Sequence, residues 1–292
     1  MIQILDGGLG MELVSRSKLP ATPLWSVQNL IEEPDQVTKL HGEFIRAGAR
    51  IITMNSYALT PQRLARHQLE DQFTSLQKKA WQCAVQARME AEAEGINNVR
   101  IAACLPPLVA SYHPETHPHE DEAIASYRRM IDLHLGHVDI FLAETMSSLR
   151  EVDDVIKAAD IFSQPLWLAC TVQDQDGTKL RSGESVQNIV GTPEFVSSVL
   201  LNCSYPEAIS DGLDVLLTDN KQVGAYANGF RSVQPLKVGG TVDVLEMRED
   251  LSPAIYADFA TQWQLKGISI IGGCCGIGPL HIEAVTAACL QR

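Results

Sequence analysis

The segment LWLACTV, residues 166–172, is short, rich in aliphatic residues and does not alternate between polar and apolar positions. This pattern is typical of a strand in a parallel sheet, where both faces of the strand are buried. Seven further segments have the same character, so the sequence predicts eight strands. They are IQIL (2–5), RIITM (50–54), VRIAAC (99–104), VDIFLA (138–143), SVLLN (198–202), QVGAYA (222–227) and GISIIG (267–272).

Longer amphipathic segments separate the predicted strands, and they begin and end as helices do. Pro, Ser or Thr stands near the start of each and Gly near the end, which is the usual distribution at helix termini. The clearest examples are residues 34–49, 74–95 and 252–267. The apolar segment 212–219 resembles a strand, but we interpret it as the end of the helix that precedes residues 222–227.

Eight strand segments that alternate with helix patterns match a (β/α)8 TIM-type barrel in number and in length. No linker or low-complexity segment interrupts the pattern, so we expect a single domain over residues 1–292. The alternative is an open doubly wound sheet, which would carry a glycine-rich phosphate loop after its first strand. The motif DGGLG (6–10) lacks the required G-x-G-x-x-G spacing, and the barrel is therefore favoured.

The composition of the chain excludes several classes of function. The formal net charge is −13, from 23 Lys and Arg against 36 Asp and Glu, so we expect no nucleic-acid partner. No segment reaches the roughly 18 apolar residues of a membrane span, so we expect no membrane partner. Residues 1–10 lack a basic region followed by an apolar core, so we do not expect them to act as a signal peptide. The seven cysteines are odd in number and scattered. They favour free or metal-bound thiols in a reducing cytoplasm over a secreted disulfide scaffold.

Polar and thiol side chains gather at the ends of the predicted strands. Because active sites of (β/α)8 barrels lie at the C-terminal ends of the strands, we expect these residues to share one face. Asn is also a common cap or turn residue, so the two asparagines among them are weaker candidates. The residues, in strand order, are Asp6, Gly7 and Gly8, then Asn55, then Glu144 and Thr145, then Cys203, then Asn228 and Gly229, and finally Cys274 and Cys275.

The adjacent pair Cys274 and Cys275, together with Cys203, forms the strongest candidate for a metal site. Two cysteines are one ligand short of a catalytic zinc site, and Cys203 from a nearby strand can supply the third. Three thiolates leave the fourth coordination position open for a substrate. Glycines on both sides of the pair let the backbone bend, so that both sulfurs can face one ion. The alternatives are buried cysteines that act as small hydrophobic residues and a redox-active vicinal disulfide.

The remaining four cysteines are placed differently. Cys104 and Cys170 lie within predicted strands, whereas Cys83 and Cys289 lie within helix patterns. We therefore exclude them from the predicted metal site.

Seven motifs spread along the chain point together to one family of enzymes. They are LDGGLGMEL (5–13), AGARIITMNSY (47–57), FLAETMSS (141–148), LLNCSYPEAI (200–209), VGAYANGF (223–230), DLSPAIYADFATQW (250–263) and IIGGCCGIGPLHI (270–282). With these motifs the sequence resembles the zinc-dependent homocysteine S-methyltransferases, which include the betaine–homocysteine methyltransferases and the homocysteine module of methionine synthases. The resemblance implies a barrel enzyme of the EC 2.1.1 class that methylates homocysteine to methionine.

The resemblance also implies roles for individual residues. Within the family the Asn-Cys and Gly-Gly-Cys-Cys-Gly motifs supply three Zn²⁺ ligands, which correspond to Cys203, Cys274 and Cys275. The family's Asp-Gly-Gly motif and its strand-four Glu help to hold the amino acid part of homocysteine. These residues correspond to Asp6, Gly7, Gly8 and Glu144. We add Asn55 and Asn228 as further substrate-binding candidates because of their position at strand ends.

Methyl transfer to a thiol explains why these residue types occur together. A free thiol has a pKa near 8.5 and only the thiolate is a good nucleophile, so a metal that ionises the bound thiol at neutral pH is useful. Zn²⁺ with three thiolates is anionic overall, which keeps the substrate sulfur electron-rich. Carboxylates such as Asp6 and Glu144 can pair with the substrate ammonium, and N–H groups of a glycine turn can receive its carboxylate.

The loop CLPPLVASYHPETHPHED (104–121) departs from the Gly-Pro-type loop that many family members have after the third strand. We expect it to lie over the site and to contact the methyl donor, with its polar half as a lid. Its histidines also suggest a second metal site, although the composition favours a solvated loop. Four aromatic residues are candidates for a wall around a cationic donor, although core packing explains each equally well. They are Trp25, Tyr57, Tyr112 and Tyr226.

The length of the chain leaves no room for folate and cobalamin modules, so we expect a small-molecule methyl donor. A sulfonium, S-methylmethionine or S-adenosylmethionine, is the first choice, and betaine is the second. The alternative from another class is a barrel that binds zinc without turnover.

Overall fold

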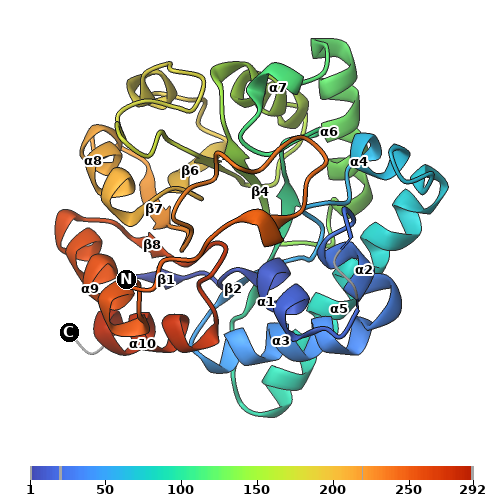
Figure 1. The fold of residues 1–292 in the computed structure, drawn as a ribbon, viewed down its shortest axis with the longest axis horizontal. Helices are drawn as coiled ribbons and strands as arrows, with labels where there is room; N and C mark the ends of the chain where they lie inside the picture. The colour runs from blue at the N-terminus through green and yellow to red at the C-terminus, as the bar shows by residue number, and fades with distance from the viewer. Residues whose placement is uncertain (1, 20–21, 219, 291–292) are drawn as a thin grey trace.

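The computed structural model describes residues 2–19, 22–218 and 220–290 (Figure 1). Its eight strands are parallel and form one sheet in the order β1-β8-β7-β6-β5-β4-β3-β2. A parallel bridge between Leu5 and Ile51 joins β1 to β2 and closes the sheet, so the predicted (β/α)8 barrel is confirmed. The strands are β1 (Gln3–Ile4), β2 (Ile51–Thr53), β3 (Arg100–Leu105), β4 (Ile140–Met146), β5 (Leu166–Cys170), β6 (Val196–Asn202), β7 (Gln222–Tyr226) and β8 (Ile270–Ile271).

Helices surround the sheet as an outer layer (Figure 1). They are α1 (Leu9–Arg16), α2 (Ser26–Glu32), α3 (Pro34–Arg46), α4 (Pro61–Ala65), α5 (Phe73–Ala93), α6 (Glu120–His134), α7 (Leu149–Ala159), α8 (Pro206–Leu216), α9 (Pro253–Lys266) and α10 (Pro279–Leu290), with short 3₁₀ helices η1 (Glu70–Gln72), η2 (Pro114–Thr116), η3 (Val186–Ile189) and η4 (Val242–Val244). Within the described ranges, none of these helices is long and apolar enough to cross a membrane.

The connection from β5 to β6 differs from the predicted alternation, because η3 takes the place of an α-helix there. The segment 171–195 contains several Gly, Asp, Ser and Thr residues, which favour turns over a helix. Two antiparallel bridges, Val172 to Leu180 and Lys179 to Ser185, fold it back on itself.

The predicted helix termini are confirmed for α9 and for the start of α3, whereas α5 begins at Phe73, before the predicted Thr and Ser, and has no side-chain cap. α9 begins after Ser252, whose side chain accepts a hydrogen bond from the Ile255 N–H, and it ends at Gly267 with a left-handed φ of 105°. Pro34 is the first residue of α3. The segment 212–219 is helical as far as Leu216, within α8, and its residue 219 lies outside the described residues.

Two apolar clusters form most of the core. The larger cluster lies between the sheet and the helices, and a smaller one, which includes Leu142, Trp167 and Leu200, fills the interior of the barrel. Each fully buried Leu or Ile contributes about 1.5–3 kcal/mol through removal of apolar surface from water. The interior cluster contacts Cys274, so the packed core ends where the candidate site begins.

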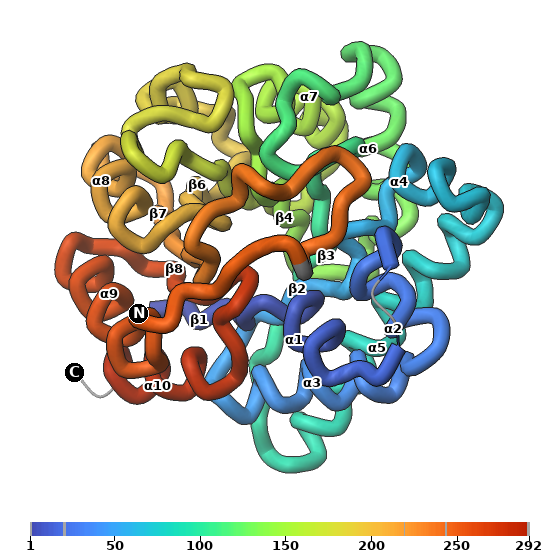
Figure 2. Tube along the Cα trace, in the orientation of Figure 1, coloured from blue at the N-terminus to red at the C-terminus, as the bar shows by residue number. Residues whose placement is uncertain are grey.

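A long segment between β7 and α9 crosses the C-terminal end of the barrel (Figures 1 and 2). We call residues 230–247 the cover segment. An antiparallel bridge between Phe230 and Met247 joins its two ends, and Arg248 after it pairs with Glu207 at 2.7 Å. The sequence predicts a lid from the polar half of the loop 104–121, but it gives no indication of the cover segment.

Candidate active site at the C-terminal end of the barrel

A cavity of about 370 Å³ opens beneath the cover segment, within the size range of small-molecule sites. Its wall contains the predicted Asp6, Gly7, Gly8, Asn55, Glu144, Cys203, Cys274 and Cys275, and also the aromatic residues Trp25, Tyr57, Tyr112 and Tyr226. Residues from strands far apart in the sequence therefore meet at one face, as expected for a barrel.

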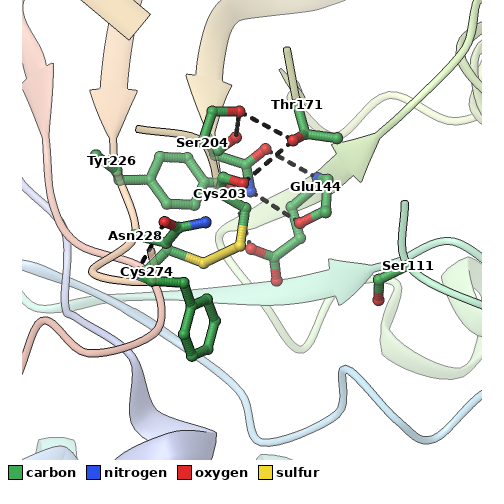
Figure 3. Close-up of a disulfide and its surroundings, with 12 residues drawn as sticks. Ser111, Glu144, Thr171, Cys203, Ser204, Tyr226, Asn228 and Cys274 are labelled. Carbon is green, nitrogen blue, oxygen red and sulfur yellow. Dashed lines mark hydrogen bonds between the residues drawn. A yellow bond between two sulfur atoms is a disulfide. The ribbon is translucent and has the colours of Figure 1, made fainter. Parts of the chain in front are cut away.

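The three predicted sulfurs lie together. The sulfur atoms of Cys203, Cys274 and Cys275 are within 4.8 Å of one another, and they form the only group of three metal-ligand side chains in the described part of the chain. A disulfide joins Cys203 to Cys274 (Figure 3), whereas Cys275 is a free thiol. The vicinal disulfide between Cys274 and Cys275, which the sequence left open as an alternative, is not present in this structure. Binding of an ion by all three thiolates requires reduction of the Cys203–Cys274 bond.

Backbone hydrogen bonds place the cysteines. The Cys203 N–H donates to the Tyr226 carbonyl at 3.1 Å, directly after β6, and the Cys274 N–H donates to the Ala227 carbonyl at 2.8 Å. Gly276 has a left-handed φ of 82°, which lets the chain turn sharply after the pair. The positions of Cys203 and Cys274 relative to each other thus depend on β7, which lies between β6 and β8 in the sheet.

The Asp-Gly-Gly turn after β1 packs directly against the turn that carries Cys274. A Cβ atom on Gly8 would lie 2.5 Å from the Cys274 carbonyl oxygen, and one on Gly7 would lie 2.1 Å from the Ile277 carbonyl oxygen. Both distances are too short for any side chain, so this contact requires glycine. The Gly8 N–H also donates to the Ile277 carbonyl at 2.9 Å.

Two buried carboxylates face the cavity. Asp6 accepts hydrogen bonds from the Thr53 N–H at 2.8 Å and from the Thr53 hydroxyl at 3.3 Å. Glu144 accepts one from the Tyr226 hydroxyl at 3.3 Å (Figure 3). No Lys or Arg in the described ranges pairs with either of them. Two buried acids without a counter-ion are suited to bind a cationic group.

Burial raises the pKa of both acids. The pKa of Asp6 is well above its usual range, mainly through burial and further through Glu144. Burial raises the pKa of Glu144 to about 6, although hydrogen bonds from Cys104 and Tyr226 act in the opposite direction. Cys104, which the sequence analysis set aside as a strand residue, therefore contacts a site carboxylate.

Glu144 lies inside β4 and not after it, which corrects the predicted strand end. β4 continues to Met146, and its register against β5 shifts between Ala143 and Met146. Thr145 within this irregularity has a left-handed φ of 63°. The distortion reorients the strand at the residue that faces the cavity.

The thiols fit a zinc ion chemically. Burial, and to a lesser degree Glu144, raises the pKa of Cys275 to about 12, so this thiol stays neutral at pH 7 without a metal. A bound divalent ion reverses that preference because it stabilises the thiolate. The Tyr112 hydroxyl donates to Cys203 Sγ at 3.2 Å, and Tyr112 therefore contacts a candidate ligand as well as the cavity.

The two predicted asparagines have structural partners. The Asn55 side chain exchanges hydrogen bonds with Ser26, at 2.7 Å to its hydroxyl and 3.0 Å to its carbonyl. Asn228 is not part of the cavity wall, and its Oδ1 accepts from the Phe230 N–H at 3.2 Å, where the cover segment begins. Both residues therefore shape the backbone around the cavity.

The histidine-rich half of the loop 104–121 does not form a cluster of ligands. His113 contacts Glu115 and the Leu236 carbonyl, both at 2.8 Å, and His117 is buried against Asp154 at 3.0 Å. The first half of the loop, including Tyr112, is the part that reaches the cavity.

Sequence reasoning missed two side chains of the site. Thr53 donates hydrogen bonds to Asp6, and its signal was its place near the end of the second predicted strand, residues 50–54. Arg63 lines the cavity from α4, and no local pattern marks it.

Comparison with known proteins agrees with the geometry. A family model described as homocysteine S-methyltransferase matches residues 3–289. The homocysteine S-methyltransferase of Escherichia coli (strain K12) is 26% identical, in a match that covers 98% of this chain and 94% of the relative. The betaine–homocysteine S-methyltransferase 1 of Danio rerio is 24% identical, with 97% and 72% covered. The crystal structure of the metallated form of the E. coli homocysteine methyltransferase MmuM has the same fold, with a TM-score of 0.82 at 24% identity and 98% and 96% covered.

Proposed function

The chain belongs to the homocysteine S-methyltransferase family, a transferase family of the EC 2.1.1 class, and on that premise we propose that it methylates L-homocysteine to methionine with a small sulfonium donor. We propose Zn²⁺ as the cofactor, with Cys203, Cys274 and Cys275 as its ligands. The observation that carries the proposal is the convergence of these sulfurs with two unpaired buried carboxylates in one cavity. We assign the activity to one homocysteine-binding barrel domain over residues 1–292.

Different residues of the cavity would bind the sulfur of homocysteine and its amino acid group. When bound, zinc would supply an ionised substrate sulfur at neutral pH. Asp6 and Glu144 hold the ammonium group. The Gly7 N–H has no partner among the described residues and can receive the carboxylate, whereas the Gly8 N–H is already bonded to Ile277. Gly8 contributes by permitting the close approach of the two turns.

The cover segment and the aromatic wall keep water from the reacting groups. Transfer of a methyl group from a sulfonium to a thiolate neutralises charge, and a dry cavity favours that step. Trp25 and Tyr57 both line the cavity and pack edge to face at 6.0 Å between ring centroids, so aromatic rings that can attract a cation lie in the wall. S-methylmethionine is the donor we propose first, then S-adenosylmethionine, with betaine as the alternative.

The disulfide places a condition on activity. Cys203 and Cys274 must be reduced to thiols, and then lose their protons, before all three sulfurs can bind an ion. We therefore propose that the enzyme acts in the cytoplasm, where thiols are kept reduced.

The experiment that tests this function combines metal and product measurements on reduced protein. We expect about one Zn²⁺ per chain, with sulfur neighbours at about 2.3 Å in X-ray absorption spectra. Methionine should form from homocysteine with S-methylmethionine, and more slowly with S-adenosylmethionine. A first shell of only nitrogen and oxygen would refute the ligand set. Faster turnover with betaine would reverse the donor assignment, and zinc-loaded protein without turnover on any donor would indicate a non-catalytic zinc barrel.

The raised pKa of Glu144 predicts a specific dependence on pH. Ammonium binding needs the ionised carboxylate, so affinity for homocysteine should be lost as the pH falls through about 6. At pH 5 roughly one tenth of Glu144 is ionised, and the KM for homocysteine should be about tenfold higher than at pH 7.5. Steady-state kinetics with zinc content measured at each pH check this. A KM that stays constant between pH 7.5 and 5 in zinc-loaded enzyme would contradict the assigned role.

A further inference from the structure

Arg63 is a cationic side chain in the cavity wall, and no acidic residue in the described part of the chain pairs with it. Its Nη2 group donates to the Pro107 carbonyl at 3.0 Å and to Ser111 Oγ at 3.3 Å. Its Nε group is buried without a hydrogen-bond acceptor, and the only other side-chain partner of the guanidinium in the described ranges is the Tyr57 hydroxyl, which is not an acid. A partly buried charge without a counter-ion is costly, so this arrangement points to an anion that the protein itself does not supply.

The surroundings of Arg63 restrict the position of its guanidinium group. The guanidinium carbon lies 5.1 Å from the centroid of the Tyr57 ring, a cation–π distance. The Tyr57 hydroxyl shares Ser111 Oγ with Arg63, at 2.7 Å. These contacts hold the guanidinium plane in place. A planar guanidinium held in this way can bind a carboxylate through two parallel hydrogen bonds.

The charged residues of the cavity wall include both signs. Asp6 and Glu144 are acidic, and Glu144 is close enough to the sulfurs to raise the pKa of Cys275. Arg63, Arg66 and Lys237 are basic, although the chain as a whole has a net charge of −13. A wall of this kind fits ligands that carry a positive and a negative group in one molecule.

Building on the proposed function, we propose that Arg63 binds the carboxylate of the methyl donor. A methyl donor is cationic, and Arg63 would repel it unless the donor also carries an anionic group. Homocysteine does not need Arg63, because its ammonium and carboxylate are assigned to the acids and to the Gly7 N–H. Arg63 therefore restricts the donor to onium carboxylates, the class to which S-methylmethionine belongs.

The test measures binding by isothermal titration calorimetry on reduced, zinc-loaded enzyme. The probes are S-methylmethionine and its carboxamide, which keeps the sulfonium and the ammonium but lacks the carboxylate charge. We expect the native enzyme to bind S-methylmethionine about tenfold to a hundredfold more tightly than the carboxamide. Arg63→Met should bring this ratio close to one, and Arg63→Lys should retain part of it. Arg46→Met is the matched control, because Arg46 pairs with Glu94 on the surface outside the cavity wall, and its ratio should equal that of the native enzyme.

Comparison of the two probes separates recognition from general damage, because a distorted cavity weakens both ligands. Equal binding of both probes by the native enzyme, or binding of neither, would overturn the proposal. The proposal would also be overturned if Arg63→Met still bound S-methylmethionine more tightly than the carboxamide by the native ratio. A loss of homocysteine affinity in that variant, with the ratio unchanged, would show that Arg63 serves the acceptor. Carboxylate-dependent binding without methyl transfer would support Arg63 as the donor site and refute the proposed function alone.

Discussion

Replacement of Cys203, Cys274 or Cys275 by alanine is expected to remove both bound zinc and methyl transfer while the barrel stays folded. Each variant leaves two thiolates, which is one fewer than a catalytic zinc site needs. Activity should fall by more than about a hundredfold, since loss of even a supporting partner of a metal ligand costs 10- to 100-fold. Each substitution removes a single sulfur atom at the end of the packed core, so the melting temperature of the metal-free protein should change little when it is compared under reducing conditions, where the Cys203–Cys274 bond is absent.

Metal analysis, circular dichroism and a methionine-formation assay on the same preparations check this result. Cys83→Ala is the matched control, because Cys83 lies in α5, outside the cavity wall, and its sulfur makes a weak contact of 3.6 Å with the Pro34 carbonyl. It should keep zinc and activity. If Cys83→Ala abolished activity as completely as Cys203→Ala, the assignment of the cysteines by their position at strand ends would be wrong.

Glu144→Gln is expected to raise the KM for homocysteine by about tenfold to a hundredfold and to leave the zinc content unchanged. The amide is nearly isosteric and can still accept the hydrogen bond from Tyr226, but it lacks the charge that pairs with the ammonium. A hydrogen bond to a charged group contributes roughly 1.5–3 kcal/mol, which gives that range. The KM for the methyl donor should change much less, because the donor has a separate binding surface.

Glu151→Gln provides the control for Glu144→Gln. Glu151 is another buried carboxylate with a raised pKa, of about 7, but it caps the start of α7 and is not part of the cavity wall. This variant should lower the melting temperature and leave the KM for homocysteine unchanged. Kinetics with both substrates varied separate the two effects. A Glu144→Gln enzyme with normal homocysteine KM would remove Glu144 from the substrate site.

The parts of the fold and site that could be predicted are those with local signals. Buried strands are uniformly apolar, and glycines beside Cys274 and Cys275 mark a turn at a strand end, so the barrel and the cluster of sulfurs followed from the sequence. The Asp-Gly-Gly turn was also marked, although its steric contact with the Cys274 carbonyl required coordinates.

Other features depend on contacts between distant parts of the chain and had no local signal. The irregularity that keeps Glu144 within β4 arises from its pairing with β5. Arg63 reaches the cavity because α4 follows β2 closely. From the sequence alone, an arginine in a short helix is expected to lie on the surface. The cover segment contains Gly and Pro but no regular period, so its path across the barrel could not be anticipated.

The proposed ligands are far apart in the order of synthesis. Cys203 and Cys274 are separated by 71 residues, and β8, which precedes Cys274, pairs with β1. A chain that grows on the ribosome folds its earlier parts first. Cys203 therefore emerges well before its partners, and the barrel closes only when β8 is available. We expect the nascent chain to remain free of metal until that step. Only chains with a completed barrel would then bind zinc and be stabilised by it.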